Sequence, residues 1–142
     1  MLGRHWVKSW SRTQATVALS SAESELYAMI KTSSEVLGMI SMLQDWGVDV
    51  TGQILGDASA CLGIIQRQGL GKMRHVDTSY LWIQEKAARK ELEFGKVEGS
   101  WNAADLLTKY LGQEDILKHM TALGIEFTSG RAVCAPKLVE YQ

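Results

Sequence analysis

Several features that often identify a class of protein are scarce in this sequence of 142 residues. Its 2 cysteines, Cys61 and Cys134, lie far apart and lack the close spacing of a zinc site, so we expect reduced thiols. No apolar run is long enough to span a bilayer, and no apolar signal core follows Met1. We therefore expect an intracellular protein, in the cytoplasm or nucleus, with no membrane partner.

An excess of charge is also missing. The formal net charge is −1, so any contact with nucleic acid needs a local basic patch. The length predicts one domain. We place it at residues 1–127 and treat 128–142 as a C-terminal tail, because the apolar periodicity weakens from Thr128 onward.

The apolar spacing predicts strands and helices in alternation. Alternation at 6–10 and the β-prone residues at 15–19 indicate extended chain. The capping box Ser20-x-x-Glu23 then opens a helix that stops at Gly47. The further elements that we expect are strands at 53–57 and 91–97 and helices at about 59–67, 76–90, from 102 or 103, and 113–123. This order favours an α/β domain of layered elements.

Three carboxylates stand at the ends of these elements. Asp57 ends a buried strand, which is where ligands collect in open α/β sheets. Glu25 lies at the margin of the apolar face of the first helix, and Asp105 lies at the start of a later one. Two have a structural alternative: Asp57 as a helix N-cap and Asp105 as a partner of a helix dipole. Glu25, at the margin of an apolar face, is costly there unless it has a partner or a function.

If the three carboxylates converge, they need cations between them. Hard oxygen ligands select Mg²⁺ or Mn²⁺, and the matching chemistry is two-metal hydrolysis of a phosphodiester. The scattered histidines disfavour zinc, and no nucleophile triad or phosphate-binding glycine loop is evident.

Several strings resemble one family in order and spacing. The strings are Trp10-Ser11-x-x-Gln14, Val17 to Ala28, Asp57-Ala58-Ser59-Ala60, Arg74-His75-Val76-Asp77 and Ala104 to Lys109. Together they resemble the ribonuclease H domain of copia-type LTR retrotransposon polyproteins, over about residues 6–111. The resemblance implies a ribonuclease H-like mixed sheet flanked by helices, which cuts the RNA strand of RNA–DNA hybrids beside a reverse transcriptase region.

The resemblance also assigns the site. Glu25 matches the catalytic Glu of the first helix, Asp57 the Asp of the central strand, and Asp105 the last acidic residue. These three residues are the implied catalytic residues and ligands of Mg²⁺ or Mn²⁺. Glu23 matches the neighbouring acidic residue, for which the capping box already gives a structural role.

The sequence departs from the family in its first part. No Asp precedes Asp45, so the leading catalytic Asp, which the family shares between both metals, is absent. The first two strands of the fold are missing with it, and Ala58 stands where the family usually has Asn. We expect the chain alone to have little or no ribonuclease activity, and the strand that ends at Asp57 to have an open edge.

Basic residues gather after the second predicted helix. Arg67, Lys72, Arg74 and His75 form a candidate patch for phosphates, continued by a basic run at 86–90; the alternative is a solvated face balanced by acidic neighbours. Trp82 and Trp101 could stack on bases, but we expect both to be buried.

Two functions remain open. One is an enzyme domain that becomes active when its missing strands are supplied upstream, with an RNA–DNA hybrid as substrate. The other is a catalytically dead, transposon-derived module that binds a partner protein, or a second copy of itself, through its exposed strand edge. A reading frame that continues upstream into a strand bearing Asp favours the first, and a true start at Met1 favours the second.

Overall fold

The computed structural model describes residues 1–3, 5–72, 74–126 and 129–130. The expected tail at 128–142 therefore lies almost wholly outside the described residues. The chain divides into two compact units, one of Ser11–Asn102 and the other of Met1–Trp10 with Ala103–Gln142.

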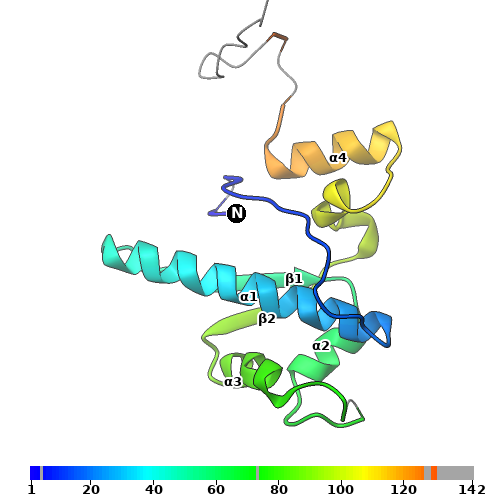
Figure 1. Cartoon of the computed structure of the whole chain (residues 1–142). Coiled ribbons are helices and arrows are strands. Elements are labelled where there is room, and N and C mark those ends of the chain that lie inside the picture. Colours follow the sequence, from blue (N-terminus) through cyan, green and yellow to red (C-terminus); the bar gives the residue numbers. More distant parts are fainter. Residues whose placement is uncertain (4, 73, 127–128, 131–142) are drawn as a thin grey trace, which may run out of the picture. The chain divides into compact units, whose positions relative to one another are not determined.

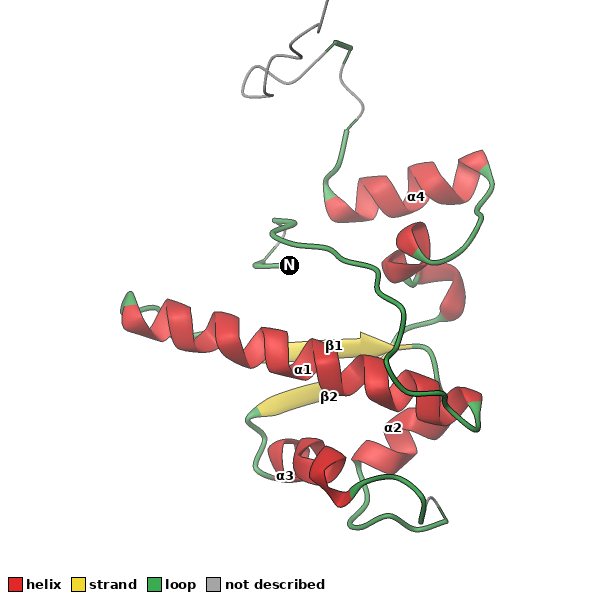
Figure 2. Cartoon of the chain, viewed as in Figure 1, coloured by secondary structure: helices red, strands yellow, loops and turns green. Residues whose placement is uncertain are grey.

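Of the elements in the described residues, the larger unit contains both strands and the longest helix (Figures 1 and 2). Its elements are α1 (Ser21–Asp45), β1 (Gly52–Gly56), α2 (Ser59–Ile65), the 3₁₀ helix η1 (Thr78–Leu81), α3 (Trp82–Ala88), β2 (Leu92–Lys96) and η2 (Gly99–Trp101). The smaller unit contains η3 (Ala103–Leu107) and α4 (Gln113–Leu123). The α/β class is confirmed.

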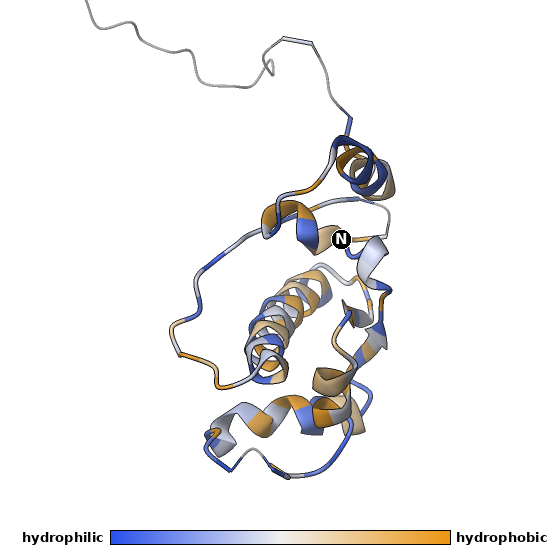
Figure 3. Ribbon diagram, turned by 90° about the vertical axis from the view of Figure 1, so that its right-hand side faces the viewer, coloured by the Kyte–Doolittle hydropathy of each residue, from blue (hydrophilic) through white to orange (hydrophobic). Residues whose placement is uncertain are grey.

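Helix boundaries follow the local signals closely. The hydroxyl of Ser20 caps α1 by accepting a hydrogen bond from the Glu23 backbone N–H, 3.2 Å away. Gly124 closes α4 in the left-handed conformation, with φ of 66°, as a glycine C-cap does. Apolar and polar residues alternate around α1 (Figure 3), and the apolar residues Leu26 and Met29 are buried. None of the described helices has the length and apolarity needed to cross a bilayer.

Three expected elements differ in the structure. Residues 6–10 and 15–19 form no strand; Val17 and Leu19 are exposed, because the described chain provides no neighbouring strand to pair with them. The helix expected from Val76 starts two residues later, as the 3₁₀ helix η1, because Asp77 is its N-cap and accepts a hydrogen bond from the Ser79 N–H. The helix expected near Ala103 is the 3₁₀ helix η3.

The sheet consists of β1 and β2 in parallel register, with Gly52 opposite Leu92 and Gly56 opposite Lys96. The chain between them passes through α2 and α3, as a parallel connection requires. One face of β1 packs on α1: a Cβ on Gly52 would lie 2.6 Å from Val36 Cγ1, and one on Gly56 would lie 2.0 Å from Met29 Cε. The buried core joins α1, α2, α3 and both strands through Leu26, Ile54, Cys61, Ile65, Ile83 and Leu92.

The outer edge of β1 is open in the described chain. The Val97 N–H donates to the Gly56 carbonyl, at 3.0 Å, so Gly56 directs its backbone toward β2. Successive residues of a strand alternate in direction, and Gln53 and Leu55 therefore direct their backbone groups to the opposite edge. The Leu55 side chain is 52% exposed. In the described residues the sheet holds only β1 and β2, which agrees with the open edge expected from the sequence.

Candidate carboxylate site and its surroundings

Asp57 follows the last residue of β1 and stands at the carboxyl end of the sheet. It does not cap α2, because the N-cap residue is Ala58 and no side chain makes a cap hydrogen bond there. The structure therefore removes the N-cap alternative. Its Oδ2 atom lies beside Gly99, where a Cβ would be 3.9 Å away. Within the described ranges, no hydrogen bond or ion pair reaches the half-buried Asp57 carboxylate.

Glu25 lies at the same end of the sheet. It precedes Met29 by one helical turn, and Met29 packs on Gly56, the residue before Asp57. Burial and, second, the charge of Glu25 raise the pKa of the Cys61 thiol to about 12, and Cys61 belongs to the first turn of α2. Glu25 and Asp57 thus both neighbour the junction between β1 and α2.

Asp105 belongs to the smaller unit, within η3. It is 8% exposed, and its Oδ2 atom accepts a hydrogen bond from Lys109 Nζ at 2.9 Å. The structure places Glu25 and Asp57 in one unit and Asp105 in the other.

The donor set can be compared with what a metal requires. Across the described residues, no three His, Cys, Asp or Glu side chains form a group that could hold a metal ion. Within the larger unit, however, the oxygens of Asp57 and Glu25 are the hard donors that Mg²⁺ and Mn²⁺ take, together with water. The Asp57 carboxylate, with no protein partner in that unit, fits such an ion.

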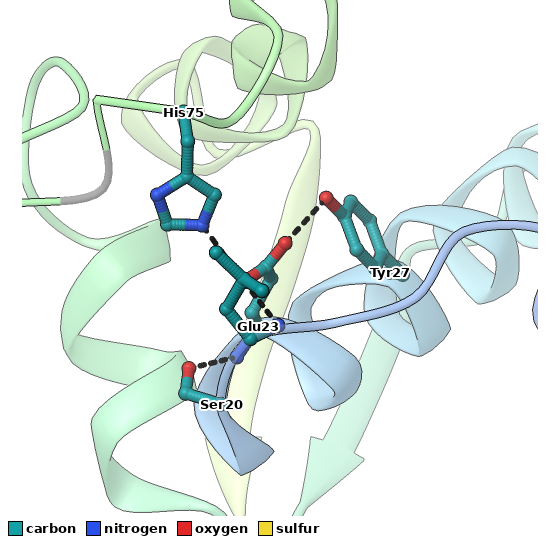
Figure 4. A network of polar contacts seen from close by, with 5 residues as sticks. Ser20, Glu23, Tyr27 and His75 are labelled. Carbon is teal, nitrogen blue, oxygen red and sulfur yellow. Dashed lines mark hydrogen bonds and ion pairs between the residues drawn. The ribbon is translucent and has the colours of Figure 1, made fainter.

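Glu23 is 2% exposed and its carboxylate has several internal partners (Figure 4). Its carboxylate accepts hydrogen bonds from the Leu19 N–H at 2.9 Å and the Tyr27 hydroxyl at 2.8 Å, and pairs with His75 Nε2 at 2.9 Å. These partners, His75 foremost, hold the pKa of Glu23 below its usual value. The hydrogen bond between the Tyr27 hydroxyl and Glu23 raises the pKa of Tyr27 to about 12.

The capping box was thus predicted correctly in one of its two contacts. Ser20 receives the Glu23 N–H as expected, but the Glu23 carboxylate binds the N–H of Leu19, one residue before the cap. The contacts with Tyr27 and His75 were not predicted. The i,i+4 spacing of Glu23 and Tyr27 was a usable signal, whereas His75 is 52 residues away and only the fold brings it close.

The four basic residues of the candidate patch have different surroundings. Arg67 donates to the Leu70 carbonyl at 2.7 Å, and its guanidinium fills the space beside Gly71, so it organises its own loop. Lys72 and Arg74 are exposed, and His75 contacts Glu23. Farther along, Lys86 pairs with Glu91, and Arg89 pairs with Glu85.

Two further residues bear on a nucleic-acid interface. Trp82 packs against the core as expected, but Trp101 is 55% exposed, so the expectation that it is buried was wrong. Lys96, at the end of β2, donates to Ser59 Oγ at 2.6 Å and was not singled out from the sequence. The strand predicted at 91–97 already places Lys96 near its carboxyl end, and this position could have marked Lys96 as a candidate site residue.

Comparisons with known proteins show a similarity to a transposon polyprotein. No family model matches the chain, and no solved structure matches it. The chain is similar to the retrovirus-related Pol polyprotein from transposon TNT 1-94 of Nicotiana tabacum, with 30% identity over 104 residues. The match covers 71% of this chain and 8% of that polyprotein, so the chain spans a small part of its relative. The chain is therefore similar to a part of a transposon Pol polyprotein.

Proposed function

We propose that the chain is the ribonuclease H-like region of a retrotransposon Pol polyprotein, which hydrolyses the RNA strand of RNA–DNA hybrids when complete. The observation that carries the proposal is Asp57, a carboxylate at the end of a buried parallel strand, without a hydrogen-bond partner in the described chain and with Glu25 at the same edge. The similarity to a transposon Pol polyprotein supports it.

In this proposal Glu25, Asp57 and Asp105 are the catalytic carboxylates and hold Mg²⁺ or Mn²⁺. A bound metal pair supplies an activated water and stabilises the leaving oxygen of the phosphodiester. Packing holds Asp57 in place, because the sheet fixes the residue before it and Gly99 lies beside its carboxylate. The ammonium of Lys109 balances Asp105 in the absence of a metal.

Binding of the hybrid rests on the basic patch and shape. Lys72, Arg74 and His75 offer exposed donors to phosphates, with Arg67 shaping their loop. The hybrid has an A-like minor groove with 2′-hydroxyls, which proteins recognise by shape. The exposed Trp101 side chain offers an aromatic surface on which a base can stack.

The 142-residue chain lacks an Asp before Asp45. A ligand that fixes the second metal is therefore missing, and we expect little or no hydrolysis by this chain alone. Activity requires strands supplied from upstream in the polyprotein, which would pair with the open edge of β1.

The decisive experiment compares two polypeptides. The first is this chain, and the second extends it upstream through whatever reading frame encodes a strand with an Asp. Each is incubated with a labelled RNA–DNA hybrid and Mg²⁺. We expect cleavage only by the longer polypeptide, lost in Asp57→Asn and retained in the matched control Asp49→Asn, an exposed carboxylate before β1. Cleavage that survives Asp57→Asn contradicts the proposal.

A second function has its own observation in its favour. The open edge of β1, with Leu55 52% exposed, suits a structural module that adds a strand from a partner or from a second copy. Light scattering of the full chain tests this: a dimer that Leu55→Lys converts to a monomer supports the structural role. A monomer at all concentrations argues against self-association.

A further inference from the structure

His75 is exposed on one side and anchored on the other. Its Nε2 atom lies 2.9 Å from Glu23 Oε2, and its side chain is 46% exposed while that of Glu23 is 3% exposed. The second ring nitrogen, Nδ1, points away from Glu23 (Figure 4), and within the described residues it has no hydrogen-bond partner. One nitrogen is therefore occupied by the protein, and the other is available to a ligand.

The contact with Glu23 fixes the orientation of the His75 ring. The Glu23 carboxylate is buried, and a buried carboxylate is costly unless a cation or several donors compensate it. The Leu19 N–H and the Tyr27 hydroxyl supply neutral donors to this carboxylate, and His75 supplies a ring nitrogen. A protonated His75 donates through Nε2 to Glu23 and has a second N–H, at Nδ1, for an anion.

The loop around His75 indicates which anion. Lys72 and Arg74 are exposed within three residues of it, and Arg67 is folded into the same loop. A nucleic acid backbone has singly charged phosphate groups at regular spacing. Such a series of anions matches a row of separate donors. The acidic residue nearest to the ring is Glu23, which is itself saturated with donors.

We propose that His75 Nδ1 donates to a backbone phosphate of the bound nucleic acid and that Glu23 is the positioning residue that orients the ring through Nε2. The proposal rests on the proposed function for the nature of the ligand. Glu23 then has a role beyond the start of α1. His75 contacts the phosphate in this proposal, whereas Arg67 shapes the loop.

The test measures binding of the full chain to a fluorescent RNA–DNA hybrid as a function of salt. One lost phosphate contact lowers the slope of log affinity against log salt by about 1. We expect that reduction in His75→Gln and also in Glu23→Gln, which keeps the size of the side chain but removes its charge. The double variant should lose no more than either single variant, because both act on one contact. His75→Arg should restore the slope.

Tyr27→Phe is the matched control. It removes one hydrogen bond to Glu23 without touching His75, so it should lower the melting temperature and leave the salt slope unchanged. An unchanged slope in Glu23→Gln, or a double variant whose losses add, overturns the role of Glu23.

A measurement on the unmodified chain guards against variants that do not fold. In imidazole ¹⁵N NMR spectra, we expect the Nδ1 resonance of His75 to move when the hybrid is added. A Nδ1 resonance that stays unchanged while the hybrid binds overturns the inference and leaves the proposed function intact. If duplex DNA and the hybrid give the same salt slope and the same shift of the Nδ1 resonance, the phosphate contact is supported. A preference of this contact for hybrids is then excluded. If the chain binds neither nucleic acid, the inference is overturned. The proposed function is then tested separately by measuring metal binding at Asp57.

Discussion

Two carboxylates of the larger unit stand in opposite situations. Glu23, at the start of α1, accepts hydrogen bonds from a backbone N–H and a tyrosine hydroxyl and pairs with a histidine. Asp57, at the end of β1, has no such partner in the described part of the chain, although backbone on both sides fixes it. Both were visible in the sequence as acidic residues at element ends, and only the contacts distinguish them.

The difference separates a carboxylate that serves the fold from one that is left for a ligand. The protein satisfies a buried carboxylate internally when its role is structural, because an unpaired one is costly. A carboxylate held rigidly without an internal partner is suited to bind an ion or a substrate. The predictions below test this contrast, from the largest effect on stability to the smallest.

The largest loss of stability is expected from Glu23→Ala. It removes the buried acceptor that the Leu19 N–H, the Tyr27 hydroxyl and His75 share, so three hydrogen bonds are lost together. The pKa of Glu23 is lowered in the folded state, so its contribution is full above the unfolded value of 4.5 and is lost as the pH falls through the folded value. Melting curves should therefore show a larger loss of stability on acidification for the wild type than for Glu23→Gln. Equal losses contradict this role of Glu23.

Gly52→Ala tests the opposite end of β1. A Cβ there would lie 2.6 Å from Val36 and 2.8 Å from Leu92, so we expect a loss of about 1–3 kcal/mol. Gly63→Ala in α2 is the control: nothing lies within 4 Å of its Cβ position, and helix propensity predicts a gain of about 0.5–1 kcal/mol. Urea unfolding measures both. Similar values for the two would argue against the close packing of β1 on α1.

Ser20→Ala removes the cap of α1. The expected cost is about 1 kcal/mol, as for N-cap residues in general. Ser21→Ala, at the exposed first residue of the helix, should change the free energy of unfolding much less. If the two variants are equally stable, the Glu23 contacts alone hold the start of α1.

Asp57→Asn should have the smallest effect, below about 0.5 kcal/mol in the free energy of unfolding, because no partner is lost. The same variant should lose any stabilisation of the chain by Mg²⁺. Urea unfolding with and without Mg²⁺ measures both effects. A cost comparable to that of Glu23→Ala would make Asp57 a structural residue and end the contrast.

The sequence predicted those parts of the fold that local signals determine. Ser20, Gly47 and Gly124 set the limits of α1 and α4, and the buried strand before Asp57 was recognised from its apolar residues. The segments at 6–10 and 15–19 were mispredicted because a strand needs a neighbour, and the described chain provides none. The start of η1 was placed two residues too early because the N-cap role of Asp77 was not recognised.

The candidate site was predictable in its residue types but not in its contacts. The position of Asp57 at a strand end follows from the pattern, and the neighbourhood of Glu25 follows from the packing of Met29 on Gly56. The pairing of Glu23 with His75 depends on the path of the chain after α2, which no local signal encodes.

The most direct test of the central claim is the binding of Mn²⁺ to the full chain, followed by paramagnetic broadening of amide NMR signals. A site at the carboxyl end of β1 predicts that the amides of Asp57, Ala58 and Gly99 broaden first, and that Asp57→Asn removes this while Asp49→Asn does not. Broadening that begins around Asp45 and Asp49, with the Asp57 amide unaffected, would contradict the account.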